Sequence, residues 1–364
     1  MNVTPEGKCL LWLSAAEVTP AKVDALTEAY GSATAVWEAF GKPDGPRFPA
    51  QAQDRLSRLH SQAAMDALLK RLDEKHVQLL FRTDAAYPPQ LLAIDDPPYV
   101  LYYAGDAGCL SRPMVAVVGT RRSSQYGRSM AKSLASGLAR AGVCVVSGLA
   151  RGIDEAAHEG ALEEGGATLG VLGSGINVPY PPEHTMLLRR IAGGNGLVLS
   201  EYPLDAEPVP FHFPHRNRLI SGLCLGVVLV EGRLKSGGML TVGAALNQGR
   251  EVFAVPGRVG CQGSEGPHTL LREGARMATC AQDVLEDLGL VPLQAPKPPT
   301  EDETLTSTQR SIIHALKVEP MNVEELQKQT GIDASALLSE LGMLEIAGLI
   351  EREAGNRFVL PIGK

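Results

Sequence analysis

Short apolar runs recur between residues 115 and 255, and most of them lead into a loop that contains glycine. Stretches with helical spacing lie between several of these runs, as at Met130, Leu134 and Leu138. Uninterrupted apolar strands that alternate with helices are typical of a parallel sheet covered on both faces. The sequence therefore predicts an α/β fold with a parallel sheet at its core. The expected strands are 115–118, 143–146, 168–172, 197–199, 227–230 and 252–255.

Different patterns flank this core. Residues 8–75 contain several short helical patterns, and 289–303 contains four prolines and is predicted to be an extended linker. Residues 304–364 contain three helical patterns and then a hairpin around Gly355-Asn356, which is typical of a winged helix. The expected division is a helical module at 1–75, a sheet domain at 76–288, a linker at 289–303 and a winged-helix domain at 304–364.

Charge is distributed unevenly along the chain. The 364 residues have a net formal charge of −7. Residues 111–260 nevertheless carry 15 Lys and Arg against 11 Asp and Glu, a net charge of +4, whereas residues 281–364 have a net charge of −7. Any polyanionic ligand is therefore expected to bind the middle of the chain.

Cysteine spacing and hydropathy further limit the classes of protein to which the chain can belong. The six cysteines form no CxxC pair and have no metal-ligand spacing, so no metal is expected. The longest apolar runs, such as 225–230, are far shorter than the roughly 20 residues of a membrane-spanning helix. Without a membrane span or a recognisable signal sequence, the expected location is cytoplasmic.

Glycine-bearing loops follow four of the predicted strands, at 119–127, 148–152, 173–176 and 231–238, and three of these loops carry Arg or Lys. Ligands of open α/β sheets bind at the carboxyl ends of the strands. Backbone amides at helix N-termini bind phosphate, and glycine lets the phosphate approach closely. A row of such loops predicts a polynucleotide backbone as ligand, although each glycine taken singly is also explained by a tight turn.

Aromatic and basic residues cluster at 211–218. Two arginines flank Asn217 and can clamp phosphates, while the aromatic residues Phe211 and Phe213 can stack on unpaired bases unless Phe213 lies in the core. The alternative for Arg218 is a buried pair with a carboxylate, because Leu219-Ile220 beside it is apolar.

Catalytic groups are sparse. Asp154 and His158 are four residues apart on a predicted helix, where a helix-stabilising hydrogen bond is favoured over an acid–base pair. Glu201 at a strand end is either an acid or a group that holds Arg216 or an amide in place. No Walker A, GxSxG or HExxH motif occurs, and GxGxxG is absent after the first parallel strand. Neither a cofactor nor catalysis is expected.

Six segments occur in one order between residues 117 and 257. They are VVGTRRSSQYG (117–127), SGLARGIDEAAHEGAL (147–162), SEYPL (200–204), FPHRNRLISGL (213–223), KSGGMLTVGAA (235–245) and AVPG (254–257). Together they resemble the bacterial DNA-processing protein A family, also called DprA or Smf.

The resemblance implies an extended Rossmann-like core with an N-terminal SAM-like or helix-hairpin module and a C-terminal winged helix. It also implies a protein that binds and protects single-stranded DNA, loads the RecA recombinase in natural transformation and recombination, and forms a homodimer through its Rossmann domain. The expected DNA-binding residues are Gly119, Thr120, Arg121, Arg122, Ser123, Gly148, Arg151, Gly152, Phe211, Arg216, Asn217, Lys235, Ser236, Gly237 and Gly238.

The predicted recognition helix of the winged helix, 334–347, contains no Lys or Arg but contains two glutamates. A phosphate backbone would be repelled by it, so this domain is predicted to contact protein rather than to anchor DNA. Weak duplex binding through Arg352, Arg357 and Lys364 stays open.

Three other functional classes account less well for the sequence. A nucleotide-binding Rossmann enzyme of the lysine-decarboxylase-like phosphoribohydrolase type is the main alternative, with 236–241 as the phosphate loop and Glu201 as the acid. A nicotinamide dehydrogenase is disfavoured because the dinucleotide fingerprint is absent. A scaffold without ligand leaves the basic glycine loops unexplained.

Overall fold

The computed structural model describes residues 3–290, 305–353 and 356–360. They belong to two compact units, Met1–Val291 and Pro292–Lys364. Nearly all of the predicted linker at 289–303 lies outside the described residues. The finer division of the first unit into a helical module and a sheet domain stays a prediction.

Within the described residues, the larger unit is built on a nine-stranded sheet with the order β1-β2-β6-β5-β4-β3-β7-β8-β9. The strands from β6 across to β9 are parallel, whereas β1 and β2 are antiparallel additions at one edge. The predicted parallel core is confirmed, while the antiparallel pairing and the short β9 were not predicted. The strands are β1 Gln78–Phe81, β2 Val100–Gly105, β3 Met114–Val118, β4 Cys144–Ser147, β5 Thr168–Val171, β6 Leu197–Ser200, β7 Gly226–Leu229, β8 Glu251–Ala254 and β9 Arg276–Met277.

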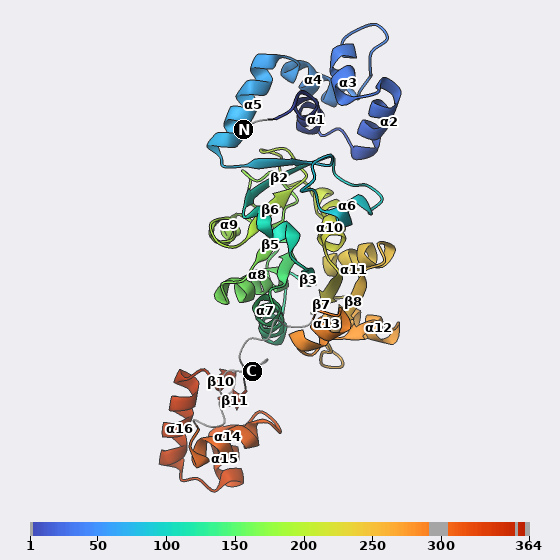
Figure 1. The fold of residues 1–364 in the computed structure, drawn as a ribbon. Coiled ribbons are helices and arrows are strands. Elements are labelled where there is room, and N and C mark those ends of the chain that lie inside the picture. The colour runs from blue at the N-terminus through green and yellow to red at the C-terminus, as the bar shows by residue number, and fades with distance from the viewer. Residues whose placement is uncertain (1–2, 291–304, 354–355, 361–364) are drawn as a thin grey trace. The chain divides into compact units, whose positions relative to one another are not determined.

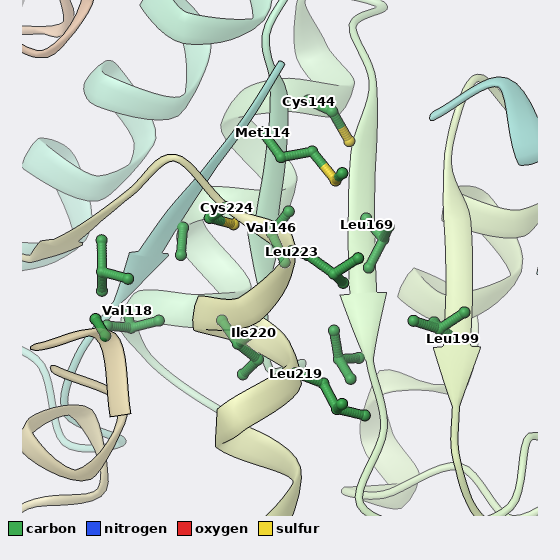
Figure 2. Packing of buried hydrophobic residues seen from close by; sticks show 14 of the residues in the cluster. Met114, Val118, Cys144, Val146, Leu169, Leu199, Leu219, Ile220, Leu223 and Cys224 are labelled. Atoms are coloured by element: carbon green, nitrogen blue, oxygen red, sulfur yellow. The ribbon is translucent and has the colours of Figure 1, made fainter. Parts of the chain in front are cut away.

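Both faces of the parallel strands are buried, which explains their apolar sequences. Alternate residues of β3 face opposite sides: Met114 belongs to one hydrophobic cluster and Val115 to another. Figure 2 shows Leu219 and Leu223 of α10 packed beside Leu169 of the sheet in the first cluster. The helices of this region are α6 Pro89–Leu92, α7 Gln125–Arg140, α8 Ile153–Glu163, α9 Thr185–Ala192, α10 His212–Leu223, α11 Gly237–Asn247, α12 Glu265–Arg272 and α13 Ala281–Asp287, with short 3₁₀ turns at Ala107–Ser111, Pro182–His184 and Gln262–Ser264.

The N-terminal helices pack at the β1–β2 edge of the sheet (Figure 1). The Tyr102 hydroxyl of β2 lies 2.9 Å from the Ser14 hydroxyl, and the Tyr99 hydroxyl donates to the Val18 carbonyl at 2.7 Å. These buried contacts join the helices and the sheet edge in one hydrophobic cluster. The helices are α1 Pro5–Ala15, α2 Pro20–Tyr30, α3 Ala33–Ala39, α4 Ala50–Leu59 and α5 Gln62–Glu74.

The smaller unit contains three helices and a two-stranded hairpin in its described part, as predicted for a winged helix. Thr306 and Gln309 form a capping box, because the Gln309 amide donates to Thr306 Oγ1 at 3.2 Å and the Thr306 amide donates to Gln309 Oε1 at 3.1 Å. The elements are α14 Ser307–Leu316, α15 Val323–Thr330, α16 Ala334–Ile346, β10 Glu351–Glu353 and β11 Arg357–Val359. Gly355 of the predicted turn lies outside the described residues.

Across the described ranges, no helix is both long enough and apolar enough to cross a membrane.

Candidate nucleic-acid interface

The chain reverses its direction of travel through the sheet at β3 and β7. Strands β4 to β6 lie on one side of β3, and β7 to β9 lie on the other. The loops that follow β3 and β7 line a cleft of about 780 Å³, together with residues from the loops after β4 and β5 and from α10. Open α/β sheets bind their ligands at such a switch point. The cleft therefore lies where the basic glycine loops were expected to converge.

Several cations at this edge are free of carboxylates in the part of the chain that the structure describes. Arg121, Arg122 and Lys235 are exposed, and in the described part of the chain none of the three forms an ion pair. Arg121 and Arg122 line the cleft, and the Arg121 guanidinium lies 5.6 Å from the centre of the Phe213 ring. Cations without a carboxylate partner keep their full charge available for an anionic ligand.

The N-terminus of α8 is occupied by the chain's own carboxylates. Asp154 Oδ2 accepts hydrogen bonds from the amides of Gly148 at 3.1 Å and Ala150 at 3.3 Å. The Gly152 amide donates to Glu155 Oε2 at 3.4 Å. These amides are therefore already satisfied within the protein. The exposed Arg151 of the same loop is also engaged, in an ion pair with Glu183.

The N-terminus of α7 is occupied in a similar way. The Ser124 amide donates to Glu231 Oε2 at 2.9 Å, and the Ser124 hydroxyl donates to Oε1 of the same carboxylate. The Ser124 oxygen in turn accepts the Gly127 amide at 3.0 Å. Ser123, one residue earlier, is half-buried and does not line the cleft.

The N-terminus of α11 is open. Gly237 and Gly238 line the cleft, and no carboxylate of the described residues accepts a hydrogen bond from their amides. Ser236 caps the helix by accepting the Met239 amide at 3.4 Å. A Cβ added at Gly237 would meet no atom within 4 Å, so packing does not explain this glycine. Of the N-termini of α7, α8 and α11, that of α11 has the geometry that a phosphate requires.

Arg216 and Asn217 are buried in the wall of the cleft rather than extended into it. The Arg216 guanidinium donates to the Gly148 carbonyl at 2.9 Å and to the Val171 carbonyl, which joins the loops after β4 and β5. Burial lowers the pKa of Arg216 to about 10. Asn217 Nδ2 donates to the Gly237 carbonyl at 3.3 Å. Both side chains therefore brace the loops that form the cleft.

Arg218 forms the buried carboxylate pair that was its alternative. Its Nη2 lies 2.6 Å from Glu201 Oε2, and His215 Nδ1 lies 3.2 Å from Glu201 Oε1. Burial by itself would raise the pKa of Glu201, but the hydrogen bond from His215 and the charge of Arg218 outweigh it and the pKa is lowered. Glu201 does not line the cleft, and it holds Arg218 rather than Arg216.

Asp154 and His158 do not act together. His158 Nδ1 lies 2.8 Å from Thr168 Oγ1, whose hydroxyl proton is directed to the Val145 carbonyl at 2.8 Å, so the imidazole is the donor. Burial lowers the pKa of His158 to about 3. The hydrogen bond expected between the two residues is wrong, because Asp154 turns toward the loop amides and His158 toward the sheet.

Of the two phenylalanines expected to stack on bases, Phe213 lines the cleft and Phe211 does not. Phe211 is 68% exposed and lines a separate, smaller cavity. Phe213 and Tyr180 line the cleft, with ring centres 5.2 Å apart. The sequence does contain a signal for Phe213, because it precedes Arg216 and Asn217 by three and four residues on one helix. Tyr180 has no comparable signal.

The two arginines of the β10–β11 hairpin form ion pairs within the smaller unit. Arg352 lies 3.3 Å from Glu345 of α16, and Arg357 lies 3.0 Å from Glu325 of α15. Lys364 lies outside the described residues. The two described residues proposed for weak duplex binding therefore have carboxylate partners.

A parallel sheet covered on both faces, with a cationic cleft at its switch point and a winged helix on the same chain, defines a Rossmann-like protein suited to a polyanionic ligand. The chain belongs to the DNA recombination-mediator protein A family, whose sequence profile matches residues 78–289. Residues 294–356 match the DprA winged helix domain. The resemblance inferred from the six segments is confirmed.

Individual relatives agree with this assignment. The chain is 39% identical over 314 residues to protein Smf of Escherichia coli, covering 84% of this chain and 83% of that protein. It is 42% identical over 223 residues to DNA processing protein DprA of Streptococcus pneumoniae, covering 59% and 78%. The X-ray structure of the S. pneumoniae protein superposes with a TM-score of 0.68 at 36% identity, covering 79% of this chain and 99% of that one.

A structure of DNA processing protein A from Helicobacter pylori gives a TM-score of 0.52 at 32% identity, covering 58% of this chain and 95% of that one. That structure concerns the single-stranded DNA binding mode of the H. pylori protein.

Proposed function

We propose that this chain binds single-stranded DNA along the cleft at the carboxyl edge of its sheet. The observation that carries the proposal is the set of unpaired cations Arg121, Arg122 and Lys235 around the open N-terminus of α11. The amides of Gly237 and Gly238 take one phosphate, and the cations take the charge of its neighbours. Single-stranded DNA binding by the H. pylori relative supports the same ligand.

Aromatic rings complete the interface. Phe213 and Tyr180 line the cleft, and unpaired bases stack on aromatic side chains with little sequence preference. A duplex keeps its bases stacked inside, so it gains nothing from these rings. The cleft therefore favours an unpaired strand.

The protein then protects the strand and delivers it to the RecA recombinase, in natural transformation and recombination. It acts as a homodimer joined through the Rossmann-like domain and catalyses no reaction on the DNA. The family description as a recombination mediator and the names of the DNA-processing relatives support this role.

The phosphoribohydrolase alternative needs an acid in the cleft. Glu201, its candidate, is paired with Arg218 and His215 and does not line the cleft. Asp154 does line it, but its carboxylate accepts two backbone amides. A base-release assay on mononucleotides is expected to show no turnover, and measurable turnover would favour the enzyme.

Fluorescence anisotropy of a labelled oligo-dT across a salt series tests the binding proposal. Arg121→Ala and Lys235→Ala are each expected to weaken binding by about 1–3 kcal/mol, as for charge-assisted contacts. The logarithm of the affinity should fall with the logarithm of salt by about 0.7 per neutralised phosphate. Arg140→Ala, at the far end of α7 and paired with Glu164, is the matched control. Weak wild-type binding, or variants that bind as the wild type does, would contradict the proposal.

Recombinase delivery needs its own assay. Nucleation of RecA filaments on DNA covered by a single-strand-binding protein is expected to speed up when this protein is added. Unchanged nucleation, with normal DNA binding, would limit the function to strand binding.

A further inference from the structure

Basic side chains gather on one side of the cleft, in the loops that follow three neighbouring strands. These loops, after β3, β7 and β8, cover residues 119–124, 230–236 and 255–261. Together they contain five Lys and Arg residues and a single acidic residue, Glu231. Glu231 is buried and bonded to Ser124, so its charge is directed into the protein.

The segments that follow β5 and β6, on the other side of the cleft, have the opposite charge. Residues 172–184 and 201–211 contain no Lys or Arg. They contain four acidic residues, Glu183, Glu201, Asp205 and Glu207. An anionic strand that extends beyond the cleft is therefore attracted toward β8 and repelled toward β6.

The loop after β8 is held beside the cleft by hydrogen bonds from two other segments. The Gly232 amide, in the loop after β7, donates to the Gly263 carbonyl at 2.7 Å. The Tyr126 hydroxyl, in the first turn of α7, donates to the Pro256 carbonyl at 2.7 Å. The surface of the cleft therefore continues directly into the loop after β8.

Two arginines mark this continuation. Arg233 is exposed, lines the cleft and donates to the side-chain oxygen of Gln262, which is a neutral partner. Arg258 is exposed outside the cleft, and within the described residues it takes part in no ion pair. Val259 beside it is 87% exposed, so this part of the loop extends into solvent. Both guanidinium groups thus keep their charge for an anionic ligand.

We propose that the bound strand leaves the cleft over the loop after β8, and that Arg233 and Arg258 bind the phosphates of the nucleotides that follow those in the cleft. The inference rests on the proposed binding of single-stranded DNA. It gives the strand a direction along the edge of the sheet and a bound length greater than that of the cleft. Phosphate contacts carry no direct sequence information, so the extension adds affinity without base preference.

The test is a length series of labelled oligo-dT in the anisotropy assay, from about 4 to about 16 nucleotides, the range of site sizes of single-strand-binding folds. The shortest strands fill the cleft, where the rings of Phe213 and Tyr180 lie. Arg258→Ala is expected to bind them as the wild type does. It should bind the longest strands about tenfold more weakly, the effect of a lost charge-assisted contact. For these strands the salt slope should fall by about 0.7.

Three further variants check the assignment. Arg233→Ala should weaken binding from a shorter strand length onward than Arg258→Ala does, because Arg233 lines the cleft. Arg258→Lys keeps the charge and should keep most of the affinity for long strands. Arg190→Ala removes an exposed arginine of α9, which packs beside β5 and β6, and should leave the affinity at the wild-type value for every length. If Arg258→Lys loses as much affinity as Arg258→Ala, or Arg190→Ala also weakens long strands, charge at this loop is not the cause and the inference is overturned.

The outcomes separate this inference from the proposed function. Tight wild-type binding together with an Arg258→Ala protein that matches it at every length overturns the exit path and leaves strand binding intact. An Arg258→Ala effect that is as large for the shortest strands as for the longest also overturns the path, because Arg258 would then act on the cleft itself. Failure of the wild type to bind any strand overturns both.

Discussion

The Glu231 carboxylate binds both the amide and the hydroxyl of Ser124, 107 residues earlier in the chain. This contact ties the loop after β7 to the start of α7. Ser124 follows Arg122 by two residues, so the contact also anchors the loop that carries Arg121 and Arg122. The approach is close enough that a Cβ at Gly127 would lie 2.3 Å from Glu231 Oε2. The two sides of the switch point are thus held together by one buried side chain.

Replacing Glu231 by alanine is expected to destabilise the fold. The Ser124 amide and hydroxyl would lose their carboxylate acceptor, and a hydrogen bond to a charged group contributes about 1.5–3 kcal/mol. Urea unfolding followed by circular dichroism measures the loss. Glu251→Ala removes an exposed partner of Arg276 and should change the free energy of unfolding by less than about 1 kcal/mol. Equal effects of the two variants would show that the Glu231 contact is dispensable.

Two glycines at the cleft should respond oppositely to alanine. Gly237→Ala meets open space, so we expect the free energy of unfolding to rise by about 0.4–1 kcal/mol while affinity for oligo-dT falls. Gly119→Ala places a Cβ 2.6 Å from Ile153 Cγ1 and 2.7 Å from the Glu231 carbonyl, so it should destabilise the protein. Paired unfolding and anisotropy measurements test this difference. Unchanged affinity in Gly237→Ala would argue against a phosphate at α11.

Substitutions of Arg216 and of Arg121 are expected to affect stability differently, although both residues were predicted to contact DNA. Arg216→Met leaves the Asp154 carboxylate buried without its compensating charge, which costs about 3–5 kcal/mol of stability. Arg121→Ala changes an exposed side chain and should alter stability by less than about 0.5 kcal/mol. Urea titrations of both variants measure this, and a stable Arg216→Met protein that fails only in DNA binding would contradict the bracing role.

His158 should make the fold sensitive to mild acid. Its folded pKa of about 3 lies below the ordinary value of 6.5, so below pH 6.5 the unfolded chain binds the extra proton. The contribution to stability is complete above pH 6.5 and is lost as the pH falls toward 3, by about 2 kcal/mol at pH 5. The pKa of His215 is raised by the hydrogen bond to Glu201. Its contribution to stability is therefore lost as the pH rises, not as it falls.

Comparison with His158→Gln isolates the effect of His158 from that of His215. From pH 7 to pH 5 the wild type should lose more unfolding free energy than His158→Gln does. The stability advantage of the wild type should therefore shrink. A difference that does not depend on pH would mean that the imidazole takes up a proton in the folded state.

Deletion of residues 304–364 is expected to leave most of the affinity for single-stranded DNA. The cleft lies wholly within the first compact unit, and α16 contributes no Lys or Arg. Anisotropy with oligo-dT should show a change of less than tenfold and an unchanged salt dependence. A larger loss would assign the winged helix a direct part in strand binding.

Local features of the fold could be predicted from the sequence, and long-range pairing could not. The capping box at Thr306 and Gln309 and the left-handed Gly31 at the end of α2 depend on residues close in sequence. The antiparallel addition of β1 and β2 beside β6 depends on packing against the N-terminal helices. Strand order follows from which faces must be buried together, and a single segment does not encode that.

Within the candidate site, motif position located the residues but did not assign their roles. Arg216 and Arg218 stand two residues apart in one motif, yet one bonds backbone carbonyls of the cleft and the other a carboxylate outside it. Their directions differ because successive residues of a helix point about 100° apart, toward different neighbours.

By itself, the sequence determined the parallel α/β core, the glycine loops at strand ends and the basic middle of the chain, because apolar periodicity and charge are local properties. Which helix N-terminus is open to a phosphate follows from the folded arrangement instead. Glu231 is 107 residues from the serine amide that it accepts, whereas no carboxylate of the described residues reaches the amides of Gly237 and Gly238. Whether a backbone amide is free depends on what the fold places beside it, and folding brings those partners from distant parts of the chain.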